Sequence, residues 1–144
     1  MRTRTFLTAV AVLAAFAAPA ARASTPGEEA AASYRLETAG STLALAPGAE
    51  GKLVLAIVPQ PGIHVHPQAP LKITLESAGL TLSKTALGHK DAVDPKAEGP
   101  RFVVPFTARE AGTHAVKAKV DFFVCSDRWC VKQVKELVVE VKVR

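Results

Sequence analysis

A period of two governs the hydrophobic pattern of the chain from Tyr34 onward. Leu53, Leu55 and Ile57 form one face of a predicted strand, and Val54 and Val58 form the other. That strand is therefore expected to be buried on both sides, since successive side chains of a strand point to opposite faces. Further runs in which apolar and polar or small residues alternate lie at 43–45, 71–76, 80–82, 102–106, 116–124 and 137–143.

Turn residues separate these runs, and no long helical stripe interrupts them. Pro47-Gly48 and 59–62 punctuate the first strands, and the polar segment 88–100 reads as a long loop. Short strands joined by turns favour a sandwich over alternating strands and helices. The sequence therefore predicts an all-β fold, an immunoglobulin-like antiparallel β-sandwich of about 7–8 strands.

The first 23 residues have the composition of a signal peptide. A cationic head precedes an apolar run from Phe6 to Ala18, and Ala21-Arg22-Ala23 forms a small-x-small cleavage pattern. We therefore expect cleavage after Ala23 and export to the periplasm. Cleavage would remove three arginines and lower the formal net charge from +5 to +2, which takes away the main support for nucleic-acid binding.

The rest of the chain divides into a tail and one domain. Residues 24–33 show no period and predict a flexible N-terminal tail, and residues 34–144 predict the β-sandwich. No segment of the mature chain is apolar enough to predict a membrane-spanning helix.

The two cysteines predict a disulfide at the end of a hairpin. Cys125 and Cys130 flank the four residues Ser126 to Trp129, between two β runs, in a chain expected to reach an oxidising compartment. Directly opposed residues of an antiparallel pair have Cα atoms about 4.5 Å apart when they form a non-hydrogen-bonded pair. That distance is near the short end of what a disulfide tolerates.

Aromatic residues gather at this hairpin. By strand parity, Phe123 shares the outward face with the cysteines, and Trp129 lies in the loop between them. An apolar patch beside a disulfide is typical of a docking surface, so Phe123 and Trp129 are predicted to bind a partner.

The residues alone leave the role of the bridge open. Cross-linking a loop this short stabilises the folded state by only about 2 kcal/mol. The bridge is therefore either a weak structural cross-link or a redox pair. Nothing in the pattern lowers a thiol pKa strongly, because the cysteines lie on strands and Asp127 offsets Arg128. Such a pair suits exchange with a more reactive thiol through a mixed disulfide.

No other constellation predicts chemistry. His64 and His66 share a strand face, as two metal ligands would, but strand-end polar residues beside Pro67 fit the pattern better, and no metal site or cofactor is predicted. His89 and His114 are isolated, and no nucleophile elbow, haem-attachment pattern or phosphate-binding loop occurs.

Three segments together resemble the N-terminal periplasmic domain of the thiol:disulfide interchange protein DsbD. They are 62–73, with Gly62-Ile63-His64-Val65-His66-Pro67, then 102–106, with an internal Val-Pro, and 120–130, with the cysteines. The chain departs from that family in having four residues rather than five between the cysteines, and no aromatic in His89 to Asp94, where the family has a cap loop.

The resemblance implies a periplasmic thiol–disulfide exchange module. Cys125 and Cys130 would be the catalytic pair, with Cys130 forming the mixed disulfide and Cys125 resolving it. The partners would be thioredoxin-like periplasmic proteins and a separate membrane electron transporter, with the direction of electron flow left open. The alternative is a non-catalytic exported β-sandwich that binds a protein or glycan and has a purely structural hairpin disulfide.

Overall fold

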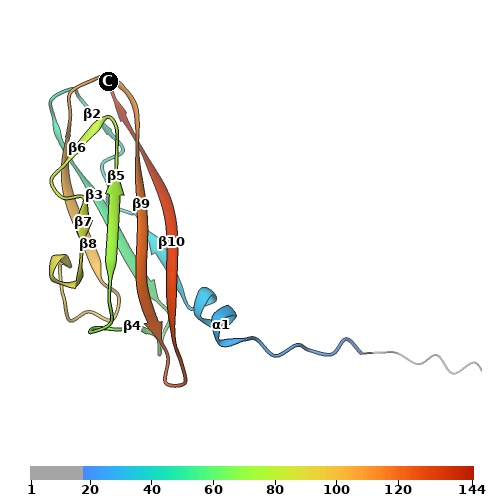
Figure 1. Cartoon of the computed structure of the whole chain (residues 1–144). Coiled ribbons are helices and arrows are strands. Elements are labelled where there is room, and N and C mark those ends of the chain that lie inside the picture. The colour runs from blue at the N-terminus through green and yellow to red at the C-terminus, as the bar shows by residue number, and fades with distance from the viewer. Residues whose placement is uncertain (1–17) are drawn as a thin grey trace, which may run out of the picture.

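Alternation of buried and more exposed side chains marks the long strands of the protein and is strict in one of them. The computed structural model describes residues 18–144, and Figure 1 shows their strands running along one long axis. In β8 (Arg101–Ala108) every second residue is buried, as the sequence pattern predicts. The remaining strands are β1 (Tyr34–Glu37), β2 (Ala44–Leu45), β3 (Glu50–Pro59), β4 (His64–Val65), β5 (Lys72–Glu76), β6 (Leu80–Leu82), β7 (Ala86–Leu87), β9 (Gly112–Cys125) and β10 (Cys130–Val143).

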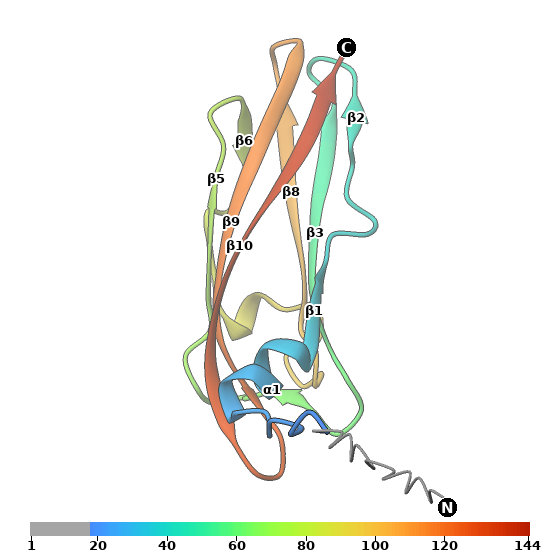
Figure 2. The ribbon, with the colours of Figure 1, turned by 90° about the vertical axis from the view of Figure 1, so that its right-hand side faces the viewer.

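These strands form two facing sheets, which Figure 2 shows side by side. One sheet has the order β1-β3-β8-β6, and the other has the order β2-β10-β9-β5-β7, with β4 also paired to β9. In chain order these correspond to the A-B-E-D and G-F-C arrangements of immunoglobulin domains. The neighbours are antiparallel except for β2, which runs parallel to β10. The predicted all-β sandwich is therefore confirmed.

The described residues contain ten strands, more than the sequence pattern predicts. The additional ones include β4 and β7, which have two residues each. A strand of two residues covers a single period of the alternation, so it leaves no recognisable pattern in the sequence. The predicted long loop at 88–100 is present and holds a short 3-10 helix, η1 (His89–Asp91).

The core lies between the sheets and is dominated by three fully buried phenylalanines, Phe102, Phe106 and Phe122. The expectation that β3 is buried on both sides is also confirmed. Val54, on the side away from the core, is 1% exposed, because the segment between β1 and β2 crosses over it. Ser41 Oγ fixes that crossing by accepting from the Val54 N–H at 2.8 Å and donating to the Val54 carbonyl.

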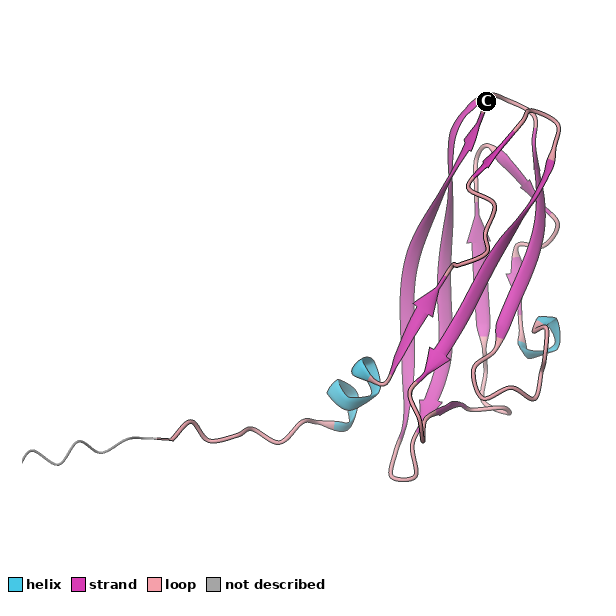
Figure 3. Ribbon diagram, turned by 180° about the vertical axis from the view of Figure 1, so that it is seen from behind, coloured by secondary structure: helices cyan, strands magenta, loops and turns pink. Residues whose placement is uncertain are grey.

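The segment 24–33 differs from the flexible tail that we expected, because it contains the helix α1 (Pro26–Ala32). Thr25 and Glu28 form a capping box, with Thr25 Oγ1 accepting from the Glu28 N–H and Glu28 accepting from the Thr25 N–H. Ala30 is fully buried, so one face of the helix is held by tertiary packing. Figure 3 shows α1 outside both sheets, at the end of the sandwich where β9 meets β10.

Candidate functional site

The two cysteines lie opposite each other at the end of the β9–β10 hairpin. Cys125 and Cys130 are register partners, their Cα atoms are 4.1 Å apart, and their sulfur atoms form a disulfide. The predicted hairpin and its bridge are therefore present. Figure 1 shows this end of the hairpin at the bottom of the molecule, beside β4.

A third strand covers one of the two cysteines. β4 pairs with β9 on the side away from β10, with His64 opposite Cys125 and Val65 opposite Val124. Cys125 is consequently 1% exposed, whereas Cys130 is exposed to solvent. The disulfide thus links β9, which lies between β4 and β10, to β10 on the outside.

The loop between the cysteines is held by its own hydrogen bonds. Ser126 N–H donates to the Trp129 carbonyl at 2.8 Å. Ser126 Oγ accepts from the backbone N–H of Arg128 at 3.0 Å and of Trp129 at 3.2 Å. The tip is therefore a defined turn that presents Arg128 and Trp129 in fixed directions.

Trp129 binds the N-terminal helix. Its indole Nε1 donates to Glu29 Oε2 at 2.9 Å, and Arg128 Nη2 lies 3.5 Å from the same oxygen. The ring also packs against the hydrophobic core. Phe123 instead lies on the outward face with the disulfide, next to Lys132 on β10. The structure thus places Phe123 with the cysteines, as predicted, but turns Trp129 toward α1 and away from Phe123.

A groove opens between the hairpin tip, α1 and the turn that precedes β4. It has a volume of about 540 Å³, and its lining includes the apolar residues Trp129, Ile63 and Pro61 and the charged residues Glu29, Asp127 and Arg128. The contribution of α1 was missed by the sequence analysis. The Thr25–Glu28 spacing is a capping-box signal that could have revealed the helix.

Tyr34 adds a second link between the N-terminal segment and the hairpin. Its hydroxyl donates to Gln133 Oε1 at 2.9 Å, and its ring stands edge-on to Phe122 with centroids 5.0 Å apart. Burial raises the pKa of Tyr34 to about 12, because the phenolate would lose contact with water.

His66 and His89 have structural partners near the turn after β4. His66 Nδ1 accepts from the backbone N–H of Gln68 and of Ala69, so it caps the turn after β4. His89 Nε2 lies 2.7 Å from the Ala69 carbonyl. Within residues 18–144, no three His, Cys, Asp or Glu side chains come together in a way that could hold a metal ion.

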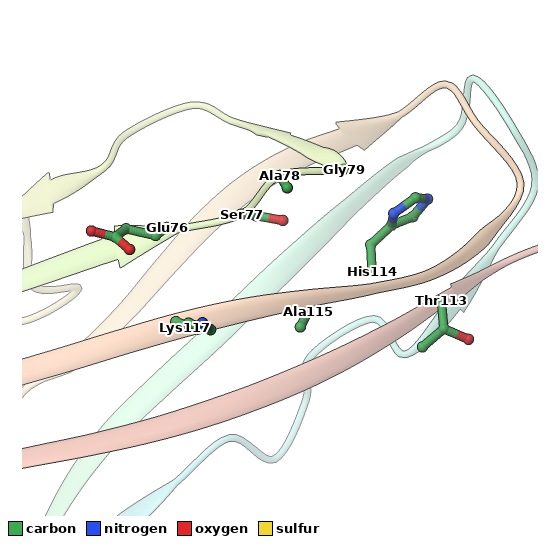
Figure 4. A pocket seen from close by; sticks show the side chains of 8 residues that line it. All are labelled: Glu76, Ser77, Ala78, Gly79, Thr113, His114, Ala115 and Lys117. Carbon is green, nitrogen blue, oxygen red and sulfur yellow. The ribbon is translucent and has the colours of Figure 1, made fainter.

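A second pocket lies at the opposite end of the sandwich, around His114. Figure 4 shows the His114 ring projecting from β9 toward the turn Ser77–Gly79, which joins β5 to β6. The pocket measures about 390 Å³, and His114 Nε2 lies 2.8 Å from the Glu110 carbonyl. A Cβ at position 79 would overlap the His114 ring, so the ring packs where only a glycine leaves room.

Fold and site together define a β-sandwich domain with a disulfide-closed hairpin tip and a groove beside it. No protein-family model matches the chain, and no curated protein matches it. Among the described residues, no helix combines the length and hydrophobicity that a membrane crossing needs.

Comparison with solved structures finds distant likenesses. One is a conjugative transposon lipoprotein from Bacteroides eggerthii, with 10% identity, a TM-score of 0.43, and coverage of 75% of this chain and 95% of that one. Domains 4 and 5 of the S-layer protein SbsC give 13% identity, a TM-score of 0.42, and coverage of 76% and 50%. A conjugate transposon protein from Bacteroides vulgatus gives 10% identity, a TM-score of 0.38, and coverage of 76% and 84%.

The resemblance to the DsbD N-terminal domain is wrong. The structures named above are conjugative transposon proteins and an S-layer protein, and neither a family model nor a curated protein supports the DsbD assignment. The redox-active centre and the exchange function that the resemblance implied lose their support with it. Apart from the cysteines, the segments that suggested it consist of turn glycines, prolines and alternating apolar residues, which are common in β-sandwiches.

Proposed function

We propose that the chain is a non-catalytic exported module that binds a segment of a partner protein in the groove at its hairpin end. In this proposal Cys125–Cys130 is a structural bridge. The observation that carries it is the junction of the hairpin tip with α1, because Trp129 and Glu29 join segments 100 residues apart to form one wall of the groove.

The surroundings of the bridge support a structural role. Cys125 is buried between β4 and β10, where three strands end together. Cross-linking this position limits fraying of the β9–β10 end, on which Trp129 depends for its direction. The loop-closure contribution is about 2 kcal/mol, which is modest but suits a hairpin tip held mainly by local hydrogen bonds.

The composition of the groove supports a protein ligand. Trp and Arg are the residue types that most often dominate the energy of protein interfaces, and both stand at the tip. Asp127 is an exposed residue of the lining, and among the described residues it has no ion-pair partner. The groove is therefore suited to a segment with an apolar side chain next to a lysine or arginine.

Export is part of this proposal and rests on the leader. Most of the predicted signal peptide, residues 1–17, lies outside the described residues, and Ala21 to Ala23 are exposed and have no regular structure. Cleavage after Ala23 would leave Ser24 and Thr25 in front of α1, so the capping box and the groove wall would stay intact.

Selection from a phage-displayed library of linear peptides tests the binding proposal. We expect enriched peptides to share an apolar residue beside a basic one. Their affinity should fall at least tenfold with Trp129→Ala and several-fold with Asp127→Asn, which leaves the packing of Trp129 in place. His114→Ala, at the other end of the sandwich, is the matched control and should leave binding unchanged. Failure to enrich any peptide, or binding that ignores both groove variants, would contradict the proposal.

A further inference from the structure

One edge of the second sheet has no neighbouring strand along most of its length. β2 pairs with β10 only at Lys142 and Val143, where the N–H of Lys142 donates to the Leu43 carbonyl. Near the other end of β10, α1 and Tyr34 lie against the strand. Between these two covers, β10 follows the margin of the sheet in Figure 1 with no strand beyond it, and the non-strand residues Thr38 and Leu43 line a pocket with Val138 and Glu140.

The backbone of this open stretch is ready to form hydrogen bonds. The even-numbered residues of β10 point their N–H and C=O groups away from β9, as Lys142 does toward β2. Among the described residues, Val134, Glu136, Val138 and Glu140 have no hydrogen-bond partner on this side. Such an edge is a template for pairing with another strand.

The side chains of the same residues lie on the outward face of the sheet and form a distinctive series. Val134 and Val138 are 48% and 58% exposed, which makes them two of the few large apolar side chains left in water. Lys132 and Glu140 stand on either side of them along the strand. When the series is laid antiparallel against a second copy of itself, four of its five positions are complementary. The series is Lys132, Val134, Glu136, Val138 and Glu140.

We propose that two copies of this chain pair antiparallel through the open edge of β10, about a twofold axis at Glu136. In this register Val134 lies opposite Val138 of the second copy, twice, and Lys132 lies opposite Glu140, twice. Apolar and opposite-charge pairs placed directly across two strands are the stabilising kind. The sheet that contains β10 then continues from one copy into the other. This pairing does not involve the groove proposed above.

Neighbouring registers are less favourable. A twofold axis at Lys135 places two lysines opposite each other, and an axis at Leu137 places Glu136 against Val138 and Glu140 against Val134. An axis at Val134 would bring the second copy against the part of β10 next to α1 and Trp129. The chosen register has one unfavourable pair, Glu136 with itself, and each Glu136 has Lys119 of β9 as its other neighbour.

The pairing is expected to be weak and therefore visible at high concentration. One strand pair buries less surface than standard protein interfaces do, so we expect a dissociation constant on the order of 10 to 100 μM. Sedimentation equilibrium of the purified chain should show a monomer–dimer equilibrium in this range. Val134→Lys and Val138→Lys should each weaken it at least tenfold, and Val93→Lys, at an exposed valine in the 88–100 loop, is the matched control.

Charge reversal tests the register itself. Glu140→Lys should weaken dimerisation several-fold, and adding Lys132→Glu should restore it, because the two pairs are then reversed together. Glu136→Gln should strengthen it by removing the like-charge pair. Circular dichroism of each variant checks that the monomer stays folded, which matters because Lys132 also pairs with Asp121 at 3.3 Å. A monomer at about 500 μM, a dimer that ignores Val134 and Val138, or a double reversal without rescue would each overturn the proposal.

Discussion

The two ends of the sandwich are built by different kinds of contact. At the hairpin end, Trp129 with Glu29 and Tyr34 with Gln133 join the N-terminal segment to the last hairpin, across about 100 residues of chain. At the opposite end, His114 bonds to the carbonyl of Glu110, four residues earlier, and packs on the nearby turn at Gly79. At that end the distant segments β2 and β10 are joined by backbone pairing, with Lys142 opposite Ala44. The hairpin end is thus joined to the N-terminal segment through side-chain hydrogen bonds, which single substitutions can remove, whereas the opposite end is joined through its backbone.

Matched glycine substitutions give the largest expected difference between the ends. A Cβ at Gly99, near the hairpin end, would overlap the backbone carbonyl of Ile57, which cannot move without distorting β3. A Cβ at Gly79 would overlap only the ring of His114, which can rotate away. We expect Gly99→Ala to cost about 3 kcal/mol of unfolding free energy. Gly79→Ala should cost about 1 kcal/mol or less. Urea denaturation measures both, and equal costs would contradict the contrast.

Removal of the disulfide should have the next largest effect. Replacing Cys125 and Cys130 by serine should lower the unfolding free energy by about 2 kcal/mol and leave the sandwich folded. Amide hydrogen exchange should then speed up in β4 and at the hairpin tip, while β8 keeps its protection. Uniform loss of protection would mean that the bridge supports the whole fold.

Substitution of Glu29 should have a smaller effect, which is confined to the contact between α1 and Trp129. Glu29→Ala removes the acceptor of the Trp129 indole and should cost about 1 kcal/mol, with faster exchange in α1. Arg128→Ala removes only the exposed ion pair with the same carboxylate and should cost about 0.5 kcal/mol or less. If α1 exchanges equally fast in both variants, the indole hydrogen bond does not hold the helix.

The pH dependence of stability gives a further test of the hairpin end, through the pKa of Tyr34. Tyr34 is the single tyrosine of the chain, so phenolate absorbance reports it alone. Its folded pKa of about 12 exceeds the ordinary 10.0, so the unfolded chain releases this proton first as the pH rises. Stability should therefore be lost between about pH 10 and 12, and Tyr34→Phe should remove this part of the pH dependence. A titration midpoint near 10 would show that the ring is not buried against the hairpin.

The sequence pattern predicts the parts of this molecule that depend on neighbouring residues. Alternation identifies the strands around Leu53, Phe102 and Val116, and the spacing of the cysteines identifies the hairpin and its bridge. The pairing of Trp129 with Glu29 and the two-residue strand β4 depend on how distant segments meet, which no local pattern contains. For the same reason strand parity places Phe123 on the outward face, whereas no pattern shows that Trp129, in the loop, turns toward α1.

The equilibrium reduction potential of Cys125–Cys130 tests the central claim, that the bridge is structural, most directly. The chain would be equilibrated with dithiothreitol and glutathione buffers, and the reduced fraction counted by thiol alkylation and mass spectrometry. A structural bridge predicts a potential below about −300 mV, so that glutathione leaves it intact. A potential between about −270 and −120 mV, the range of exchange proteins, would contradict the account and return Cys125 and Cys130 to a redox role.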